Sequence, residues 1–148
     1  MTCNWVMQVA TVPKLVAVAV ESDSVTRRLV ESGGGFAVSV LARSERAVVR
    51  RFVKPTESVT TDDQGVALTM QGQPVREVAG GLPRLASARS WLVCEVRHLL
   101  DWAGAGPDGQ SSHVLAVGEV VDAGEAEGDQ GDRDGVLRME DTRMSYGG

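Results

Sequence analysis

The most informative polar side chains lie in one short stretch, Glu21 to Arg28, which directly follows the apolar run Leu15–Val20. Three hydroxyl residues are spaced through this stretch, Ser22, Ser24 and Thr26. A strand that leads into a helix leaves the first backbone N–H groups of the helix free, and the helix dipole favours an anion there. The stretch therefore predicts either a phosphate site or simple helix capping, and the residue types alone favour capping.

Side chains that could act as nucleophiles or bases are few. The chain has two histidines, His98 and His113, and two cysteines, Cys3 and Cys94. Their spacing forms no Ser/His/Asp or Cys/His arrangement, and a single histidine on a strand is more often structural than catalytic. Four such residues also nearly exclude a structural zinc site and a disulfide framework. An enzyme built on this chain is therefore expected to depend on chemistry that its side chains do not supply.

Two other patterns resemble functional motifs without their structural context. The run GAGPDG at residues 104–109 fits G-x-G-x-x-G, but a dinucleotide site needs a strand before it and a helix opening within it. A turn is expected at Pro107 and Asp108, and a strand after it, so the run predicts a hairpin loop. Glu95 and Glu119 lie on the two late strands, but their sequence positions do not establish a carboxylate pair.

Composition limits the class of protein. The 148 residues fit one domain, and the net charge of −5 argues against general nucleic-acid binding. The longest apolar run, Leu15–Val20, is too short to span a membrane, and the N-terminus lacks the pattern of a signal peptide. We expect a soluble, cytoplasmic protein without membrane association, whose cysteines are reduced.

The elements that must position these residues are mostly strands. Period-two alternation and valine-rich runs predict strands over 2–9, 15–20, 36–41, 90–100 and 112–121, the last two as an antiparallel hairpin. Helices are expected from Asp23 or Ser24 to Gly33 and from Ser44 to Phe52, and the basic residues of the second helix are expected on a solvated face. Residues 53–89 predict a long loop with short elements, and residues 122–148 an acidic, partly irregular arm. The fold class is mainly β (α+β), a small barrel with short flanking helices.

Four segments in this order resemble the flavin reductase family, which has an FMN-binding split β-barrel fold. They are MTCNWVMQVATVPKLVAVAV, SDSVTRRLVESGGGFAVSVL, the RRF of AVVRRF, and SWLVCEVRHLLDWAGAGPDGQSSHVLAVGEVVDAG. The resemblance covers nearly the whole chain and implies a single domain over residues 1–148. Family members carry a helix and a strand before the Met-Thr motif, so the resemblance implies that Met1 is an internal methionine of a longer reading frame.

The resemblance also implies the residues of an FMN site. It places the first segment around the flavin, the hydroxyl-rich turn at the phosphate, and His113 beside the nicotinamide. The implied flavin-binding residues are Thr2, Cys3, Asn4, Trp5, Gln8, Ser22, Ser24, Thr26 and Ser39, the last standing where the family usually has Asn. Trp5 has two interpretations, stacking on the flavin or filling the core. The match at the turn raises the phosphate interpretation above capping.

By this resemblance, the expected activity is that of an NAD(P)H:flavin oxidoreductase. Hydride would pass from NADH or NADPH to FMN, with FAD as the alternative flavin. The resemblance further implies a homodimer and a partner monooxygenase that receives reduced flavin. Two alternatives stay open: a non-enzymatic flavin-binding or electron-transfer protein of the same fold, and a truncated module without cofactor.

Overall fold

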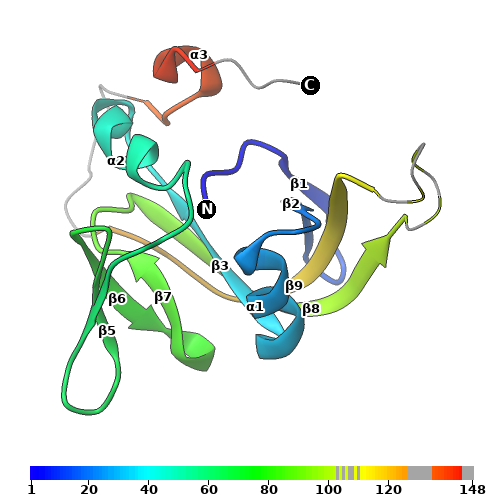
Figure 1. The fold of residues 1–148 in the computed structure, drawn as a ribbon, viewed down its shortest axis with the longest axis horizontal. Helices are drawn as coiled ribbons and strands as arrows, with labels where there is room; N and C mark the ends of the chain where they lie inside the picture. The colour runs from blue at the N-terminus through cyan, green and yellow to red at the C-terminus, as the bar shows by residue number, and fades with distance from the viewer. Residues whose placement is uncertain (103, 105, 107–108, 110, 127–134, 145–148) are drawn as a thin grey trace.

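Strands form most of the molecule. A computed structural model describes residues 1–102, 104, 106, 109, 111–126 and 135–144. Its strands form two antiparallel sheets of five and four strands, and short helices lie beside them (Figure 1). The mainly β prediction is confirmed, while the two sheets are not closed into one continuous barrel.

The five-stranded sheet carries the predicted strands. Its order is β1 (Val6–Ala10), β2 (Leu15–Glu21), β9 (His113–Glu125), β8 (Ser90–Asp101) and β3 (Gly35–Val40). The apolar run lies in β2, between β1 and β9, and most of its side chains are buried. A strand covered on both faces needs a nearly continuous apolar sequence, which explains why this run is the clearest strand signal. The predicted hairpin is confirmed as the β8–β9 pair.

Residues 53–89 form more structure than the predicted long loop. They contain a second sheet of four short strands, β4 (Val59–Thr61), β5 (Ala67–Met70), β6 (Gln73–Val78) and β7 (Leu82–Leu85). These strands are three to six residues long and β4 is fully exposed, so the alternation of polar and apolar residues is weak. A tight turn at Gln71 and Gly72, both with positive φ, joins β5 to β6.

The predicted helices are present with shifted ends. Helix α1 (Val25–Gly33) is capped by the Ser24 side chain and ends at Gly34 in the left-handed conformation. Of the expected apolar stripe only Val30 is buried, while Val25 and Leu29 are exposed. The second helix begins with a 3₁₀ turn, η1 (Arg43–Glu45), and continues as α2 (Arg46–Arg51). Within the described residues, no helix is long and apolar enough to cross a membrane.

The main core lies on one face of the five-stranded sheet. Valines of β2 and β9 pack there with Cys94, and the Phe36 ring lies against them. A Cβ added at Gly118 would lie 2.7 Å from the Cβ of Cys94 and 2.8 Å from the Phe36 ring. The ring therefore crosses β9 at a position where only glycine leaves room. Both Cys3 and Cys94 are free thiols, so no disulfide joins them.

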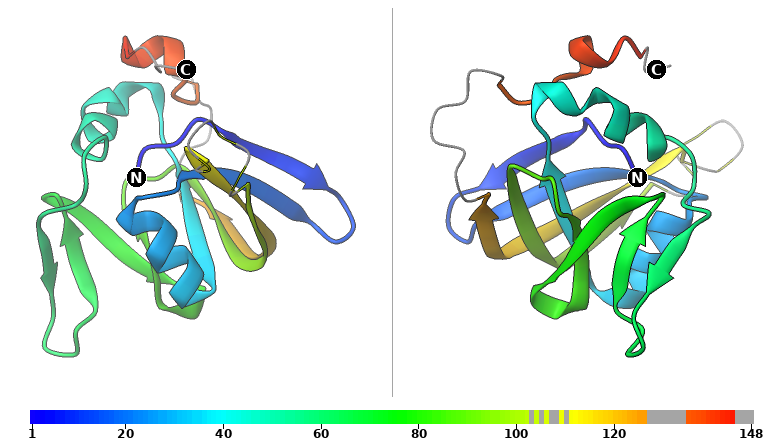
Figure 2. Two further views of the ribbon diagram at one scale, coloured as in Figure 1. Left: turned by 45° about the vertical axis from the view of Figure 1, so that its right-hand side comes forward. Right: turned by 90° about the vertical axis from the view of Figure 1, so that its left-hand side faces the viewer.

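The C-terminal region is more regular than the predicted arm. Strand β9 extends to Glu125, and residues 135–144 return to the body of the molecule (Figure 2). There the Leu137 N–H bonds the Leu41 carbonyl at 2.9 Å, and a short helix, α3 (Met139–Thr142), follows. Leu137 and Met144 pack on a second apolar cluster beside α2. Residues 127–134 and 145–148 of the predicted arm lie outside the described residues.

Candidate functional site

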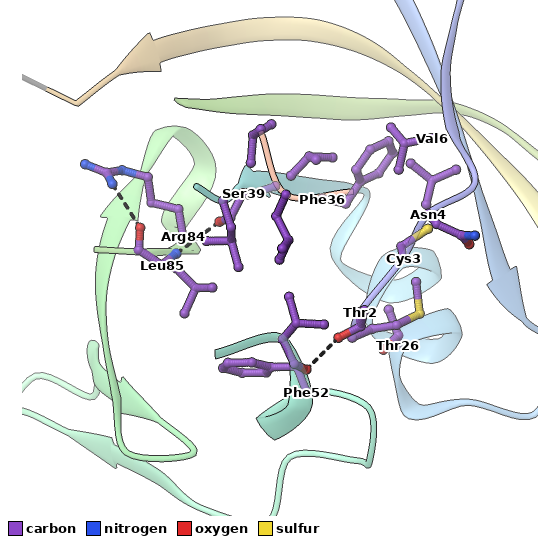
Figure 3. Close-up of a pocket in the computed structure, with 18 of the residues that line it drawn as sticks. Thr2, Cys3, Asn4, Val6, Thr26, Phe36, Ser39, Phe52, Arg84 and Leu85 are labelled. Atoms are coloured by element: carbon purple, nitrogen blue, oxygen red, sulfur yellow. Dashed lines mark hydrogen bonds between the residues drawn. The ribbon is translucent and has the colours of Figure 1, made fainter. Parts of the chain in front are cut away.

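A cavity of about 810 Å³ lies between the two sheets. Its wall is largely apolar and draws on the N-terminal segment, both sheets, α1, α2 and residues 136–144. Phe36 and Phe52, the only phenylalanines of the chain, both line it (Figure 3). A cavity of this size and polarity is typical of a small-molecule or cofactor site.

Five residues implied by the family resemblance line this cavity. Thr2, Cys3, Asn4 and Thr26 lie together on one side, and Ser39 lies on the opposite side (Figure 3). The structure therefore brings together residues from three separate segments of the chain. Four other residues assigned to the flavin, Trp5, Gln8, Ser22 and Ser24, do not line the cavity.

The N-terminal segment is held against the end of α2. The Thr2 N–H donates to the Phe52 carbonyl at 3.0 Å, and the Thr2 hydroxyl donates to the Val49 carbonyl at 3.0 Å. The Cys3 thiol approaches the Ala19 carbonyl at 3.7 Å, and burial raises the pKa of this thiol. Cys3 is therefore neutral near pH 7 and suited to contact a ligand as a small apolar group, not as a nucleophile.

Ser39 joins the two sheets at the far side of the cavity. Its hydroxyl oxygen accepts the Leu85 N–H at 3.1 Å, so a side chain of β3 bonds the backbone of β7 (Figure 3). The family usually has Asn at this position, and because a Ser side chain is shorter than Asn, the Ser39 hydroxyl stays close to the cavity wall. Ser39 thus helps to position the wall of the cavity that it lines.

The three hydroxyl residues of the turn after β2 differ in their partners. Ser24 accepts the Arg27 N–H at 3.0 Å and donates to the Glu21 carbonyl at 2.7 Å, so its side chain is used in capping. The Ser22 hydroxyl is buried and has no hydrogen-bond partner among the described residues, and Thr26 lines the cavity. An unpartnered buried hydroxyl at a helix start fits a site for an anionic group.

Arg27 supplies positive charge at the same turn. Its guanidinium lies 3.2 Å from the Asp101 carboxylate and 3.8 Å from that of Glu31, and it donates to the Ser22 carbonyl at 3.5 Å. These contacts hold the side chain beside the start of α1. The turn thus combines an unpartnered hydroxyl, N–H groups at the helix start and an arginine that is ion-paired with two carboxylates.

His113 lies outside the cavity but next to this turn. Its ring contacts the Trp5 ring at a centroid distance of 5.2 Å and a tilt of 54°, and its Nδ1 lies 3.0 Å from the Ser112 hydroxyl. The Ser112 carbonyl accepts the Ser22 N–H at 3.0 Å, which ties the histidine to the turn. Trp5 is 48% exposed, so it does not fill the core. The pair forms an open aromatic surface beside the turn.

The remaining candidates are apart from the cavity. The Gln8 side chain is exposed on the edge strand β1 and donates to the Ala10 carbonyl at 3.1 Å. Glu95 and Glu119 are cross-strand partners, and Arg97 bonds both carboxylates, at 3.2 and 2.9 Å. This ion-paired group is exposed and does not form an acid/base pair. The described residues contain no cluster of side chains that could hold a metal ion.

Two parts of the cavity wall have no counterpart among the predicted residues. Arg84 and Leu85 come from the region expected to be a loop, and Met139 and Thr142 come from the expected irregular arm. These residues reach the cavity only through tertiary packing, which leaves no local pattern. Phe36 and Phe52 also line the cavity, and no local sequence pattern marks them as site residues.

Comparison with known proteins agrees with this geometry. The family "Flavin reductase like domain" matches residues 1–145. A Streptomyces globisporus NADH:FAD oxidoreductase is 26% identical, with a TM-score of 0.67 over 85% of this chain and 67% of that one. The styrene monooxygenase flavin reductase from Pseudomonas putida is 24% identical, with a TM-score of 0.64 over 86% of this chain and 70% of that one.

A Thermus thermophilus FMN-binding protein shares the fold at 20% identity, with a TM-score of 0.66 over 85% of this chain and 63% of that one. No curated protein sequence matches the chain. The family match extends over nearly all 148 residues, and the fold and cavity agree with it. The chain therefore belongs to the flavin reductase family of oxidoreductases.

Proposed function

We propose that this protein is an NAD(P)H:flavin oxidoreductase that binds FMN with its phosphate at the turn after β2. The observation that carries this proposal is the unpartnered Ser22 hydroxyl in the same turn as Thr26, which lines the 810 Å³ cavity. Both hydroxyls lie at the start of α1, where free N–H groups favour an anion. Ser24 contributes indirectly, by capping the helix that presents these donors.

The cavity suits the ring system of a flavin. Its wall is largely apolar, and the Asn4 side chain with the nearby backbone offers a few localised polar contacts. When bound, the flavin supplies the hydride-accepting chemistry, so the chain needs no nucleophile or strong base. The raised pKa of the Cys3 thiol agrees with this, because a neutral thiol does not compete for the flavin as a nucleophile.

The open surface formed by Trp5 and His113 is the proposed nicotinamide side. Both rings are partly exposed next to the turn after β2, so a planar ligand can stack on them there. In this arrangement His113 contacts the nicotinamide and orients it, and Trp5 packs against the histidine ring. NADH and NADPH are both compatible with this surface.

Reduced flavin is proposed to serve a partner monooxygenase, as the name of the styrene monooxygenase flavin reductase indicates for that relative. The protein is proposed to act as a homodimer. Support comes from exposed apolar side chains of the edge strand β1 and the turn after it, with Met7 at 61% and Val12 at 91% exposure. Apolar side chains gathered on one edge of a sheet are typical of a contact surface.

Titration with FMN tests the phosphate assignment. Ser22→Ala and Thr26→Ala each remove one proposed phosphate donor, so each is expected to weaken FMN binding by about tenfold. Ser32→Ala is the matched control, because Ser32 is an exposed hydroxyl on the opposite end of α1. Unchanged FMN affinity in both Ser22→Ala and Thr26→Ala would show that the phosphate binds elsewhere.

Oxidation of NADH and NADPH in the presence of FMN tests the activity. The proposal predicts flavin-dependent oxidation of at least one of the two, and a rise in KM for that nucleotide in His113→Ala. A protein that retains FMN but is reduced by neither nucleotide would instead be a flavin-binding or electron-transfer protein.

A further inference from the structure

Two arginines face each other on the second sheet. Arg76 of β6 and Arg84 of β7 are direct partners in the antiparallel register. Directly opposed residues project to the same face, with Cβ atoms about 5 Å apart. The adjacent pair, Val75 and Leu85, projects to the other face and lines the cavity. Arg84 also belongs to the cavity wall, whereas Arg76 is exposed and does not line the cavity.

The charge of this pair is not neutralised by the described part of the chain. Like charges directly across a strand pair are unfavourable. Partial burial lowers the pKa of Arg84, and the charge of Arg76 lowers it further. Neither arginine forms an ion pair with a described carboxylate. Glu77 follows Arg76 but is opposed to Pro83, so it projects to the other face. The pair is therefore suited to an external anion.

Arg84 is held in one orientation. Its guanidinium carbon lies 3.7 Å from the centre of the Trp91 ring, and its Nη1 donates to the Leu85 carbonyl at 3.0 Å. The Trp91 ring in turn lies directly against Gly124, where an added Cβ would clash with it. The Nε of Arg84 is buried with no hydrogen-bond partner among the described residues. A fixed guanidinium with unused donors loses little entropy when it binds a ligand.

We propose that Arg76 and Arg84 form a second anion site, which binds a phosphate group of a nucleotide ligand. Two guanidinium groups on one face can give charge-assisted, bidentate hydrogen bonds to phosphate oxygens. The choice of a nucleotide rests on the proposed function, because flavin and nicotinamide nucleotides both carry phosphate. Arg84 belongs to the cavity wall opposite Thr26 (Figure 3), so the arginine pair cannot share one phosphate with the turn after β2.

Titration calorimetry with inorganic pyrophosphate and with ADP tests the site without any flavin. Arg76→Gln and Arg84→Gln are each expected to weaken binding of both probes by about tenfold. Arg84→Lys keeps the charge but loses the planar fork, and is expected to weaken binding by several-fold. Arg50→Gln is the matched control, an exposed arginine on α2 that does not line the cavity.

Two results would overturn the proposal. One is that the wild-type protein binds neither pyrophosphate nor ADP. The other is that Arg50→Gln weakens binding as much as Arg76→Gln, which would mean a general charge effect. Arg76 is exposed, so Arg76→Gln is expected to keep the urea unfolding midpoint of the wild type. A folded Arg76→Gln protein therefore gives a valid answer even if Arg84→Gln unfolds.

The same variants identify the source of the phosphate. Affinity lost for FAD but kept for FMN assigns the site to the adenylate of the flavin. A KM raised for NADPH but not for NADH assigns it to the 2′-phosphate of the nicotinamide nucleotide. Unchanged values for all four ligands would contradict the site. If the protein binds pyrophosphate through these arginines but does not bind FMN, the arginine site is supported and the proposed function is refuted.

Discussion

The two sheets enclose one cavity but are built differently. In the five-stranded sheet, β8 and β9 are 12 and 13 residues long, and buried valines line β2 and β9. In the four-stranded sheet the strands have three to six residues, and Val75 alone is buried among its described residues. We infer that the first sheet determines the fold and positions α1, while the second sheet forms a thinner wall that can vary in sequence.

The two proposed anion sites lie in these two differently packed sheets. The turn after β2 belongs to the densely packed sheet and includes backbone N–H groups of α1, whose position depends on that packing. The arginine pair belongs to the thin wall and depends on two side chains and one register. Mutations in the first region should therefore affect stability and ligand binding together. Mutations in the second should affect binding with little change in stability.

Gly118→Val is expected to give the largest effect. The new side chain would meet the Cβ of Cys94 and the Phe36 ring at less than 3 Å, so the core must shift. We expect a loss of about 3 kcal/mol in the free energy of unfolding, measured by urea denaturation. Gly80→Ala is the control in the other region, where φ is positive but nothing lies within 4 Å, and about 1 kcal/mol is expected. Equal losses would contradict the proposed division between the sheets.

Valine-to-alanine substitutions should also lower the stability of the two sheets by different amounts, although the difference is smaller than for the glycine substitutions. Val114 in β9 is fully buried, so Val114→Ala is expected to destabilise the protein by about 2 kcal/mol. Val59 in β4 is about half exposed, and Val59→Ala is expected to cost less than about 0.5 kcal/mol. Thermal and urea unfolding of the two variants give this comparison directly. A larger loss at Val59 would mean that the four-stranded sheet is the more stable region.

Cys94 makes the stability of the five-stranded sheet sensitive to high pH. Burial raises the pKa of this thiol from 9.0 to about 11. Between these values the unfolded chain loses the proton while the folded chain keeps it, so stability falls as pH rises. Unfolding measured from pH 8 to 11 should show a steeper fall in the wild type than in Cys94→Ala. Parallel curves for the two proteins would show that the thiol titrates alike in both states.

Ser39→Ala is expected to give a small effect at one contact and tests the link between the sheets. The substitution leaves the Leu85 N–H without its acceptor, which should cost about 1 kcal/mol. Hydrogen exchange at the Leu85 amide should accelerate, while the amides of β2 keep their protection. Faster exchange throughout β2 would show that the sheets unfold as a single unit.

The sequence predicted correctly those elements whose own residues carry a clear hydrophobic or turn pattern. The apolar run of β2 and the hairpin of β8 and β9 carry their own patterns, and the family motifs follow the same segments. Strands β6 and β7 were missed because Pro74, Pro83 and the opposed arginines obscure any alternation. In α1 the predicted apolar stripe was only partly correct, since Val30 is buried while Val25 and Leu29 are exposed.

The candidate site was only partly predictable for a related reason. Thr2, Cys3 and Thr26 were identified from family motifs, but their meeting at one side of a cavity depends on α1 packing beside β2. The different roles of Ser22 and Ser24 depend on the two hydrogen bonds that the Ser24 side chain makes at the helix start. The contact of Trp5 with His113 follows from the register of β1, β2 and β9, which neither residue indicates locally.

The visible absorption spectrum of the protein after mixing with FMN and desalting tests the central claim most directly. Binding at the turn after β2 predicts a yellow protein that retains flavin and is bleached by NADH or NADPH under anaerobic conditions. The retained flavin should decrease in Ser22→Ala and Thr26→Ala but not in Ser32→Ala. A wild-type protein that emerges colourless and does not oxidise either nucleotide in the presence of FMN would contradict the account.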